Sequence, residues 1–111
     1  MKFAKKILFK NTKQARIFVE FLEIPSLGML IESAAQSSSA LSESSHIQNA
    51  YIVSMKNIKQ LHLPTKMTLE VEVSIEQSLE NIQLIYFEIF EDSKSIVSGH
   101  LTIAIEKEKI S

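Results

Sequence analysis

Hydrophobic and polar residues alternate strictly over residues 67–75, where every second residue is apolar and the others are Thr, Glu or Ser. A period of two places alternate side chains on opposite faces of a β-strand. The segment is therefore predicted to be a strand with one buried face and one wet face. Residues 95–106 repeat the pattern. Residues 81–90 have apolar side chains on both faces of the predicted strand, which predicts a central strand covered on both faces.

Shorter patterns predict the remaining strands. Residues 5–9 and 15–22 read as two strands around the polar turn at 11–14, and a further strand is predicted at 50–58. The polar residues 91–94 separate two strand patterns, as in a β-hairpin.

A single segment follows helical spacing, and it begins after Pro25. Ser26 is a suitable N-cap, because its hydroxyl can accept a hydrogen bond from an amide of the first turn. The predicted helix ends at residue 42 or 43. Its buried stripe narrows from large to small side chains, which lets a helix lie close to a sheet. The stripe consists of Leu27, Leu30, Ile31, Ala34, Ser38 and Leu41.

The predicted order is two strands, one helix and four further strands. This order indicates an α+β fold, in which one central helix is wrapped by a curled antiparallel sheet of about five to six strands. The length of 111 residues suits a single domain over residues 1–111.

Composition excludes several classes of function. The chain has no cysteine, which excludes disulfides and thiolate metal sites. The net charge is −1 and no basic stripe is present, so nucleic-acid binding is not expected. The first apolar stretch, Ile7 to Phe9, is too short for a secretory signal, and no run approaches the ~18 residues of a membrane span. We therefore expect a cytoplasmic protein without membrane association.

Two stretches resemble motifs of a known superfamily. Residues 29–36 (MLIESAAQ) are similar to a helix motif with an acidic residue followed by small residues and glutamine. Residues 56–71 (KNIKQLHLPTKMTLEV) are similar to a strand, a proline-containing loop and an alternating strand. Over residues 15–106 the chain resembles the hot-dog superfamily, and within it the 3-hydroxyacyl-carrier-protein dehydratases.

The resemblance implies a homodimer whose sheets pair edge to edge, with the strand at 50–58 at the seam. An acyl chain would lie in a tunnel at the dimer interface, and its thioester would lie near the start of the helix. The implied partner is an acyl-carrier protein or coenzyme A that carries the acyl group, and the implied setting is fatty-acid metabolism.

The acid–base pair of the dehydratases is incomplete here. Dehydration needs one group to remove the α-proton and another to protonate the leaving hydroxyl. Glu32 matches the acidic residue, and Gln36 matches the glutamine that orients it. The family's histidine position corresponds to Phe18, and no histidine precedes His46. The family's later Pro-Gly-Asp loop is Pro-Thr-Lys at residues 64–66.

Three functions therefore stay open. The chain is either a dehydratase-like protein that binds acyl thioesters with an incomplete site, or an acyl-thioesterase, or a non-catalytic regulatory or partner subunit. A thioesterase could use Glu32 with Gln36, aided by the N–H groups from Gly28 to Leu30 at the helix start. The simpler alternative is that Glu32 and Gln36, four residues apart, form an exposed polar face of the helix.

Four apolar residues could line the acyl tunnel, although packing in the core or at the dimer seam explains each equally well: Phe18, Met29, Tyr51 and Met55. The histidines at 46, 62 and 100 are scattered, and His100 is expected to be solvated. No two of them have the spacing of metal ligands, so neither a metal nor a cofactor is predicted.

Overall fold

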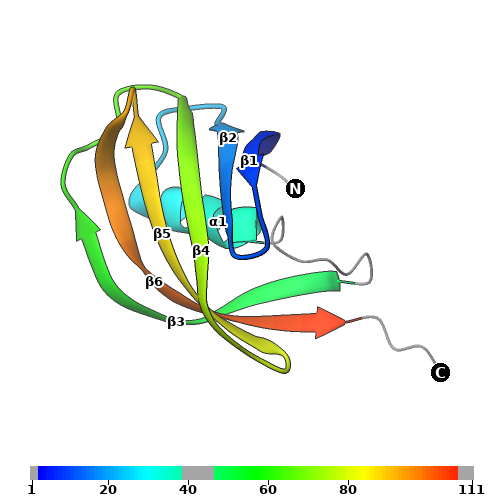
Figure 1. Cartoon of the computed structure of the whole chain (residues 1–111). Coiled ribbons are helices and arrows are strands. Elements are labelled where there is room, and N and C mark those ends of the chain that lie inside the picture. Colours follow the sequence, from blue (N-terminus) through cyan, green and yellow to red (C-terminus); the bar gives the residue numbers. More distant parts are fainter. Residues whose placement is uncertain (1–2, 39–46, 108–111) are drawn as a thin grey trace.

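The computed structural model describes residues 3–38 and 47–107. Within them the chain forms one helix and six strands, in the predicted order (Figure 1). The elements are β1 (Ala4–Lys10), β2 (Gln14–Glu20), α1 (Leu27–Ser38), β3 (Ile47–Gln60), β4 (Thr68–Leu79), β5 (Ile82–Glu91) and β6 (Lys94–Lys107).

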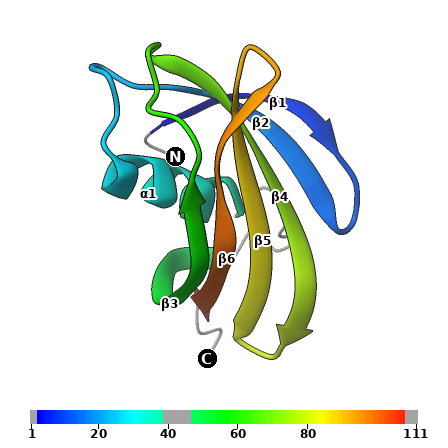
Figure 2. The ribbon, with the colours of Figure 1, turned by 90° about the vertical axis from the view of Figure 1, so that its left-hand side faces the viewer.

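The six strands form one antiparallel sheet in the order β1-β2-β4-β5-β6-β3. The chain leaves β2, forms α1 and enters the sheet again at the opposite edge as β3. The sheet curls around the helix, as Figures 1 and 2 show. This arrangement confirms the predicted α+β fold.

The core lies between α1 and the inner, concave face of the sheet. Side chains of β2, β4, β5 and β6 reach it at every second position, because successive residues of a strand point to opposite faces. Its largest fully buried members are Phe87, Ile17, Leu30, Leu69, Ile85, Ile89, Ile96, Leu101 and Ile103.

The outer, convex face of the sheet carries the side chains that alternate with the buried ones along each strand. The prediction that the strand at 81–90 is central is confirmed, because β5 lies between β4 and β6. The prediction that both of its faces are covered is wrong for the single chain. Leu84, Tyr86 and Phe90 on its outer side are only half-buried, since no second layer packs there among the described residues.

The helix begins as predicted. The Ser26 hydroxyl accepts a hydrogen bond from the Met29 amide at 3.2 Å, which confirms Ser26 as the N-cap. Ala34 and Ser38 are buried as predicted, whereas the burial of Ser33 and Ser37 goes beyond the predicted stripe. The Ser33 hydroxyl donates to the Leu30 carbonyl at 2.6 Å within the same helix. The helix is described as far as Ser38, so the predicted end at residue 42 or 43 lies outside the described residues.

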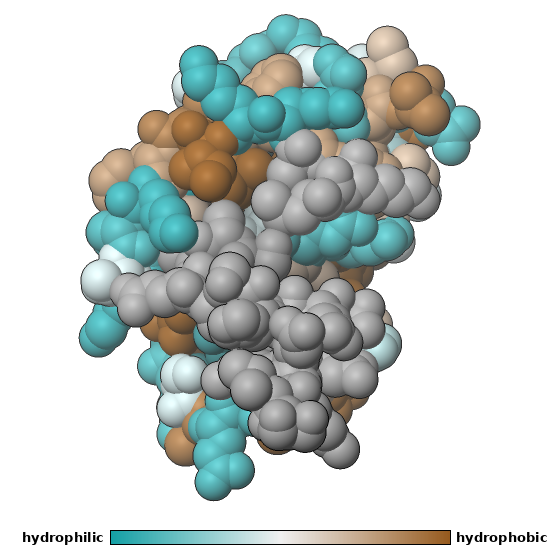
Figure 3. Space-filling model, turned by 90° about the vertical axis from the view of Figure 1, so that its right-hand side faces the viewer, coloured by the Kyte–Doolittle hydropathy of each residue, from teal (hydrophilic) through white to brown (hydrophobic). Residues whose placement is uncertain are grey.

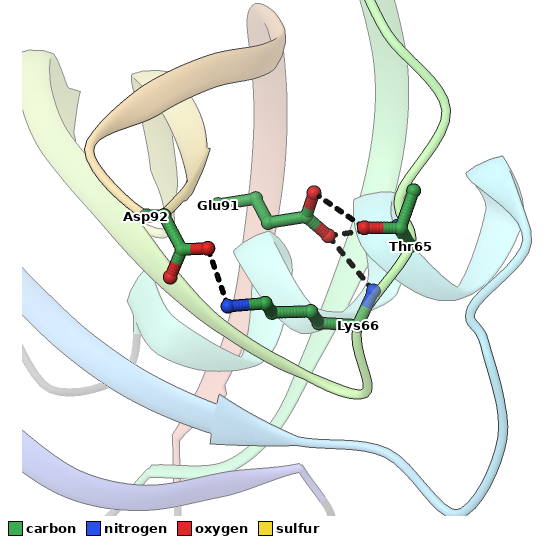
Figure 4. Close-up of polar contacts among 4 residues, drawn as sticks. All are labelled: Thr65, Lys66, Glu91 and Asp92. Atoms are coloured by element: carbon green, nitrogen blue, oxygen red, sulfur yellow. Dashed lines mark hydrogen bonds and ion pairs between the residues drawn. The ribbon is translucent and has the colours of Figure 1, made fainter.

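The β5–β6 hairpin has a two-residue turn, as residues 91–94 predict. Its central residues Asp92 and Ser93 have φ of 50° and 70°, the left-handed values of a type I′ turn. Glu91 beside the turn accepts three hydrogen bonds from the β3–β4 loop (Figure 4): the Thr65 amide at 2.7 Å, the Thr65 hydroxyl at 2.9 Å and the Lys66 amide at 2.8 Å. An ion pair between Lys66 and Asp92 adds a fourth contact, so the hairpin holds the loop in place.

The edge strand β1 mixes two kinds of exposed side chain. Lys5 and Lys6 are exposed, and the apolar Ile7 and Phe9 are 49% and 50% exposed. Figure 3 views the molecule from the side on which β1 lies and shows hydrophobic patches between hydrophilic ones. Lysine side chains along a free edge disfavour pairing with the edge of another chain.

Candidate functional site

Four of the predicted site residues share one side of α1. Gly28, Glu32 and Gln36 follow one another at intervals of four residues, and Met29 precedes Glu32 by three, so that they form the stripe that the sheet leaves uncovered. Gly28 and Glu32 are exposed, and Met29 and Gln36 are half-buried. Leu30 is fully buried in the core, so its side chain does not join this stripe.

Gln36 holds the Glu32 carboxylate, as predicted for an orienting glutamine. The Gln36 side-chain amide donates from Nε2 to Glu32 Oε1 at 3.3 Å. Gln36 Oε1 accepts from the backbone amide of Phe3 at 3.3 Å. Phe3 is itself buried and packs on Phe21 with ring centroids 4.7 Å apart. Because the Gln36 amide is bonded at both ends, the orientation of Glu32 Oε1 is restricted.

The start of the helix lies on the same stripe and is open. A Cβ atom added to Gly28 would approach only the Ser26 hydroxyl, at 3.9 Å. The prediction that the N–H groups from Gly28 to Leu30 are available is wrong for two of them, because the Met29 amide donates to the Ser26 hydroxyl and the Leu30 amide donates to the Ser26 carbonyl. The amides of Leu27 and Gly28 lie in the first turn, where no intrahelical acceptor is available. Such N–H groups can polarise a carbonyl oxygen that binds at the helix start.

Phe18 lies away from this stripe. It follows Ile17 and precedes Val19, both of which are fully buried on the inner face of β2. The alternation of the strand therefore directs Phe18 to the outer face, with the sheet between it and α1. Phe18, which corresponds to the family's histidine position in the sequence, therefore does not lie beside Glu32.

Tyr51 and Met55 of β3 lie on opposite faces of the sheet. Met55 is paired with the buried Leu101, so it is on the helix side. Tyr51 is paired with Ala104 on the outer side. Both are about half exposed, at 53% and 54%. Of the two, Met55 is the residue that shares a face with α1.

No histidine of the described chain lies beside Glu32. His62 is exposed in the β3–β4 loop, and His46 lies outside the described residues. His100 is on the outer face of β6, where its Nε2 is 3.2 Å from Glu76 Oε1. The prediction that His100 is solvated is therefore incomplete, because His100 also contacts Glu76. Glu76 is the extra residue of a β-bulge in β4, and such a bulge leaves no pattern in the sequence.

The stripe combines a carboxylate, an amide that orients it and free helix amides. A carboxylate can act as a general base, and the helix amides can stabilise a negative oxygen. A second acid–base group beside Glu32, which dehydration requires, is not found among the described residues. The same residues hold no cluster of three or more His, Asp or Glu side chains that could bind a metal.

Searches by structure find proteins of the same fold. A hypothetical thioesterase from Streptococcus pneumoniae, solved with coenzyme A, has a TM-score of 0.72 at 10% identity and covers 95% of this chain and 88% of its own. The protein smu.793 from Streptococcus mutans, bound to acetyl-CoA, has 0.72 at 11% identity, with coverages of 94% and 90%. The dehydratase heterocomplex ApeI:P from Xenorhabdus doucetiae has 0.73 at 11% identity, with coverages of 96% and 84%.

These similarities confirm the hot-dog fold. Both thioesterase and dehydratase structures are among them, so the fold does not single out the dehydratase branch that the sequence motifs resemble. No family model matches the sequence, and no curated protein is similar to it. Within the described residues, no helix has the length and apolar composition needed to cross a membrane.

Proposed function

We propose that this chain binds acyl thioesters at the exposed stripe of α1, with the thioester at the helix start and the carboxylate of Glu32 beside it. The observation that carries the proposal is the hydrogen bond from Gln36 to Glu32 on the stripe that also contains Gly28. It supplies an oriented base next to free amides. Structures of the same fold contain coenzyme A and acetyl-CoA.

The proposed assembly is a homodimer that pairs through β3. This strand lies at an edge of the sheet and exposes a run of apolar side chains. Pairing with the same strand of a second copy would cover them and would satisfy the free backbone groups of the edge. The exposed fractions are 53% for Tyr51, 37% for Ile52, 60% for Val53 and 54% for Met55.

Met55 lies on the helix side of that edge. In the proposed dimer it would therefore contribute to an acyl tunnel between the two copies, while Tyr51 would contribute to the outer surface. Either coenzyme A or an acyl-carrier protein would deliver the acyl group. We further propose that the protein acts in fatty-acid metabolism and is located in the cytoplasm.

We propose that the chain alone does not dehydrate 3-hydroxyacyl thioesters at an enzymatic rate. In the described part of the chain Glu32 has no histidine beside it, and one carboxylate does not supply both proton transfers. One of the similar structures is a dehydratase heterocomplex. That observation favours an extension in which a homologous partner chain supplies the histidine.

Hydrolysis is the second candidate, because it can proceed with Glu32 alone. The carboxylate would remove a proton from a water molecule as the water oxygen adds to the thioester carbonyl. The C–S bond would then break, and the proton would pass from Glu32 to the leaving thiolate. Gln36 donates to Glu32 Oε1, so Glu32 Oε2 is the oxygen that we propose as the base.

The test compares the parent chain with Glu32→Gln, and with Glu80→Gln as a control in the exposed β4–β5 turn. Binding of coenzyme A and butyryl-CoA is measured by calorimetry, and thiol release is measured with a thiol reagent. Thioester binding in all three proteins, with thiol release lost only in Glu32→Gln, supports binding and hydrolysis.

Binding without thiol release in any of the proteins supports the non-catalytic form of the proposal. Absence of binding by the parent chain overturns the proposal as a whole. Formation of enoyl-CoA from 3-hydroxybutyryl-CoA by the chain alone, at an enzymatic rate, would contradict the incomplete site.

A further inference from the structure

A cavity lies on the outer face of the sheet, on the side opposite to α1. Its volume is about 230 Å³, below the range of roughly 300–1,000 Å³ of most ligand pockets, so it suits a small molecule. We refer to it as the outer-face pocket. It is lined by Lys56, Asn57, Glu76, Leu84, Ile85, His100, Leu101 and Thr102.

Two β-bulges form the walls of the outer-face pocket. In β4 the pairing with β5 shifts between Ile75 and Gln77, so Glu76 is the extra residue. In β3 the pairing with β6 shifts after Lys56, and Asn57 has a left-handed φ of 55°. A bulge changes the direction of a side chain and often occurs next to a binding site. Here both bulges direct polar residues to one place.

The His100 ring fixes the charge on one wall. Its Nε2 is 3.2 Å from Glu76 Oε1, and the Tyr86 ring packs on it with centroids 5.2 Å apart. Its Nδ1 is buried and has no hydrogen-bond partner among the described residues. A proton on Nδ1 would be a buried unpaired donor, which is costly. The tautomer with its proton on Nε2 therefore donates to Glu76 Oε1 and holds this carboxylate at the wall of the pocket.

The same geometry indicates binding rather than catalysis. His100 cannot exchange a proton with a ligand through Nδ1, because that atom is buried. Its Nε2 is already occupied by Glu76. The imidazole thus positions the carboxylate of Glu76.

The opposite wall carries a positive charge. Lys56 is the cross-strand neighbour of His100 and lines the same pocket, yet the ion pairs of the described chain include none between Lys56 and Glu76. Asn57 and Thr102 add hydrogen-bonding groups to the lining, and Leu84 adds an apolar surface. The outer-face pocket therefore presents one cation, one anion and a short apolar stretch.

We propose that the outer-face pocket binds a small zwitterion of the amino-acid class, with its carboxylate at Lys56 and its ammonium group at Glu76. A ligand with only a negative charge would be repelled by Glu76, and a ligand with only a positive charge would be repelled by Lys56. A zwitterion with a short carbon chain pairs both charges and covers Leu84. This site is independent of the thioester function, because the sheet separates it from Glu32.

The probe is 4-aminobutanoate, titrated into the ¹⁵N-labelled protein while backbone amide shifts are recorded. Butanoate and butylamine serve as matched probes, since each keeps one charge and the same carbon chain. We expect saturable shifts at amides of residues 56–57, 76 and 100–102, with a dissociation constant of about 1–10 mM. Each singly charged probe should bind at least about fivefold more weakly.

Substitutions test each charge in turn. Lys56→Met and Glu76→Gln should each weaken 4-aminobutanoate binding by about fivefold or more. Lys59→Met and Glu88→Gln, outside the pocket lining, should leave it unchanged. An unchanged dispersion of amide signals shows that each variant is folded.

Three outcomes overturn the proposal. Equal binding of butanoate, with no effect of Glu76→Gln, would make this a simple anion site. Equal binding of butylamine, with no effect of Lys56→Met, would make it a simple cation site. Absence of saturable shifts up to about 50 mM of 4-aminobutanoate would show that the pocket does not bind this class of ligand.

Discussion

The side chain of Ile58 packs directly against Gly99 on the neighbouring strand, where only a hydrogen atom fits. A Cβ on Gly99 would collide with Ile58 Cδ1, and it would lie 3.0 Å from Phe87 Cε1 and 3.3 Å from Ile58 Cα. The left-handed Asn57 that precedes Ile58, with φ of 55°, belongs to the bulge that lets Ile58 reach this place. The glycine in β6 and the bulge in β3 therefore depend on each other.

Gly99→Ala should destabilise the protein by about 1–3 kcal/mol, because the added methyl group overpacks a filled site. Urea unfolding followed by circular dichroism measures the change. The substitution Ile58→Val removes Cδ1, the atom with which the new Cβ would collide. It should therefore lower the free energy of unfolding by a smaller amount in the Gly99→Ala variant than in the parent. A Gly99→Ala variant as stable as the parent would show that the close packing is absent.

Ser26→Ala should lower the free energy of unfolding by about 1 kcal/mol, since the Met29 amide loses its acceptor. Ser26→Asp keeps an acceptor oxygen at the same place and should retain most of the stability. Thermal unfolding of the three proteins under one buffer condition measures the effect. Equal losses in Ser26→Ala and Ser26→Asp would contradict the capping role.

Glu91 should make stability depend on acid pH. The Thr65 amide, with further hydrogen bonds from the Thr65 hydroxyl and the Lys66 amide, lowers the pKa of Glu91 below its ordinary 4.5. A lowered pKa stabilises the folded state above the unfolded pKa, and the contribution is lost as pH falls through the folded value. The parent should therefore lose stability relative to Glu91→Gln as pH drops below 4.5.

The measurement is the melting temperature of both proteins between about pH 3 and pH 7. The difference between them should be constant near neutral pH and should shrink in acid. A difference that stays constant down to the acid end would show that the Glu91 contacts do not form in solution. Glu88→Gln on the same strand controls for the loss of one negative charge.

Val53→Lys and Met55→Lys test the proposed dimer at β3. Each places a charge within the exposed apolar edge, where Val53 is 60% and Met55 is 54% exposed, so pairing would bring like charges together. Light scattering after size exclusion should show a dimer for the parent and a monomer for each variant. Leu63→Lys, at an exposed loop position, should remain dimeric. A monomeric parent at high concentration would contradict the dimer.

Local pattern predicted most of the fold. The cap at Ser26 is confirmed, and the alternation is confirmed from Thr68 to Ser74, whereas Met67 lies before β4 and is 47% exposed. Side-chain direction along a strand and hydrogen bonding in a first helical turn depend on neighbours in sequence. The spacing of Glu32 and Gln36 likewise predicted their contact, since residues four apart adjoin on a helix.

The sequence by itself therefore determined the strands, the helix start and the stripe with Glu32, which depend on residues a few positions apart. Only the tertiary structure decided that Phe18 lies on the outer face and that His100 meets Glu76. These outcomes depend on how β2, β4, β5 and β6 curl around α1. They depend also on bulges that shift the register between strands, and a register shift leaves no mark on the period of either strand alone.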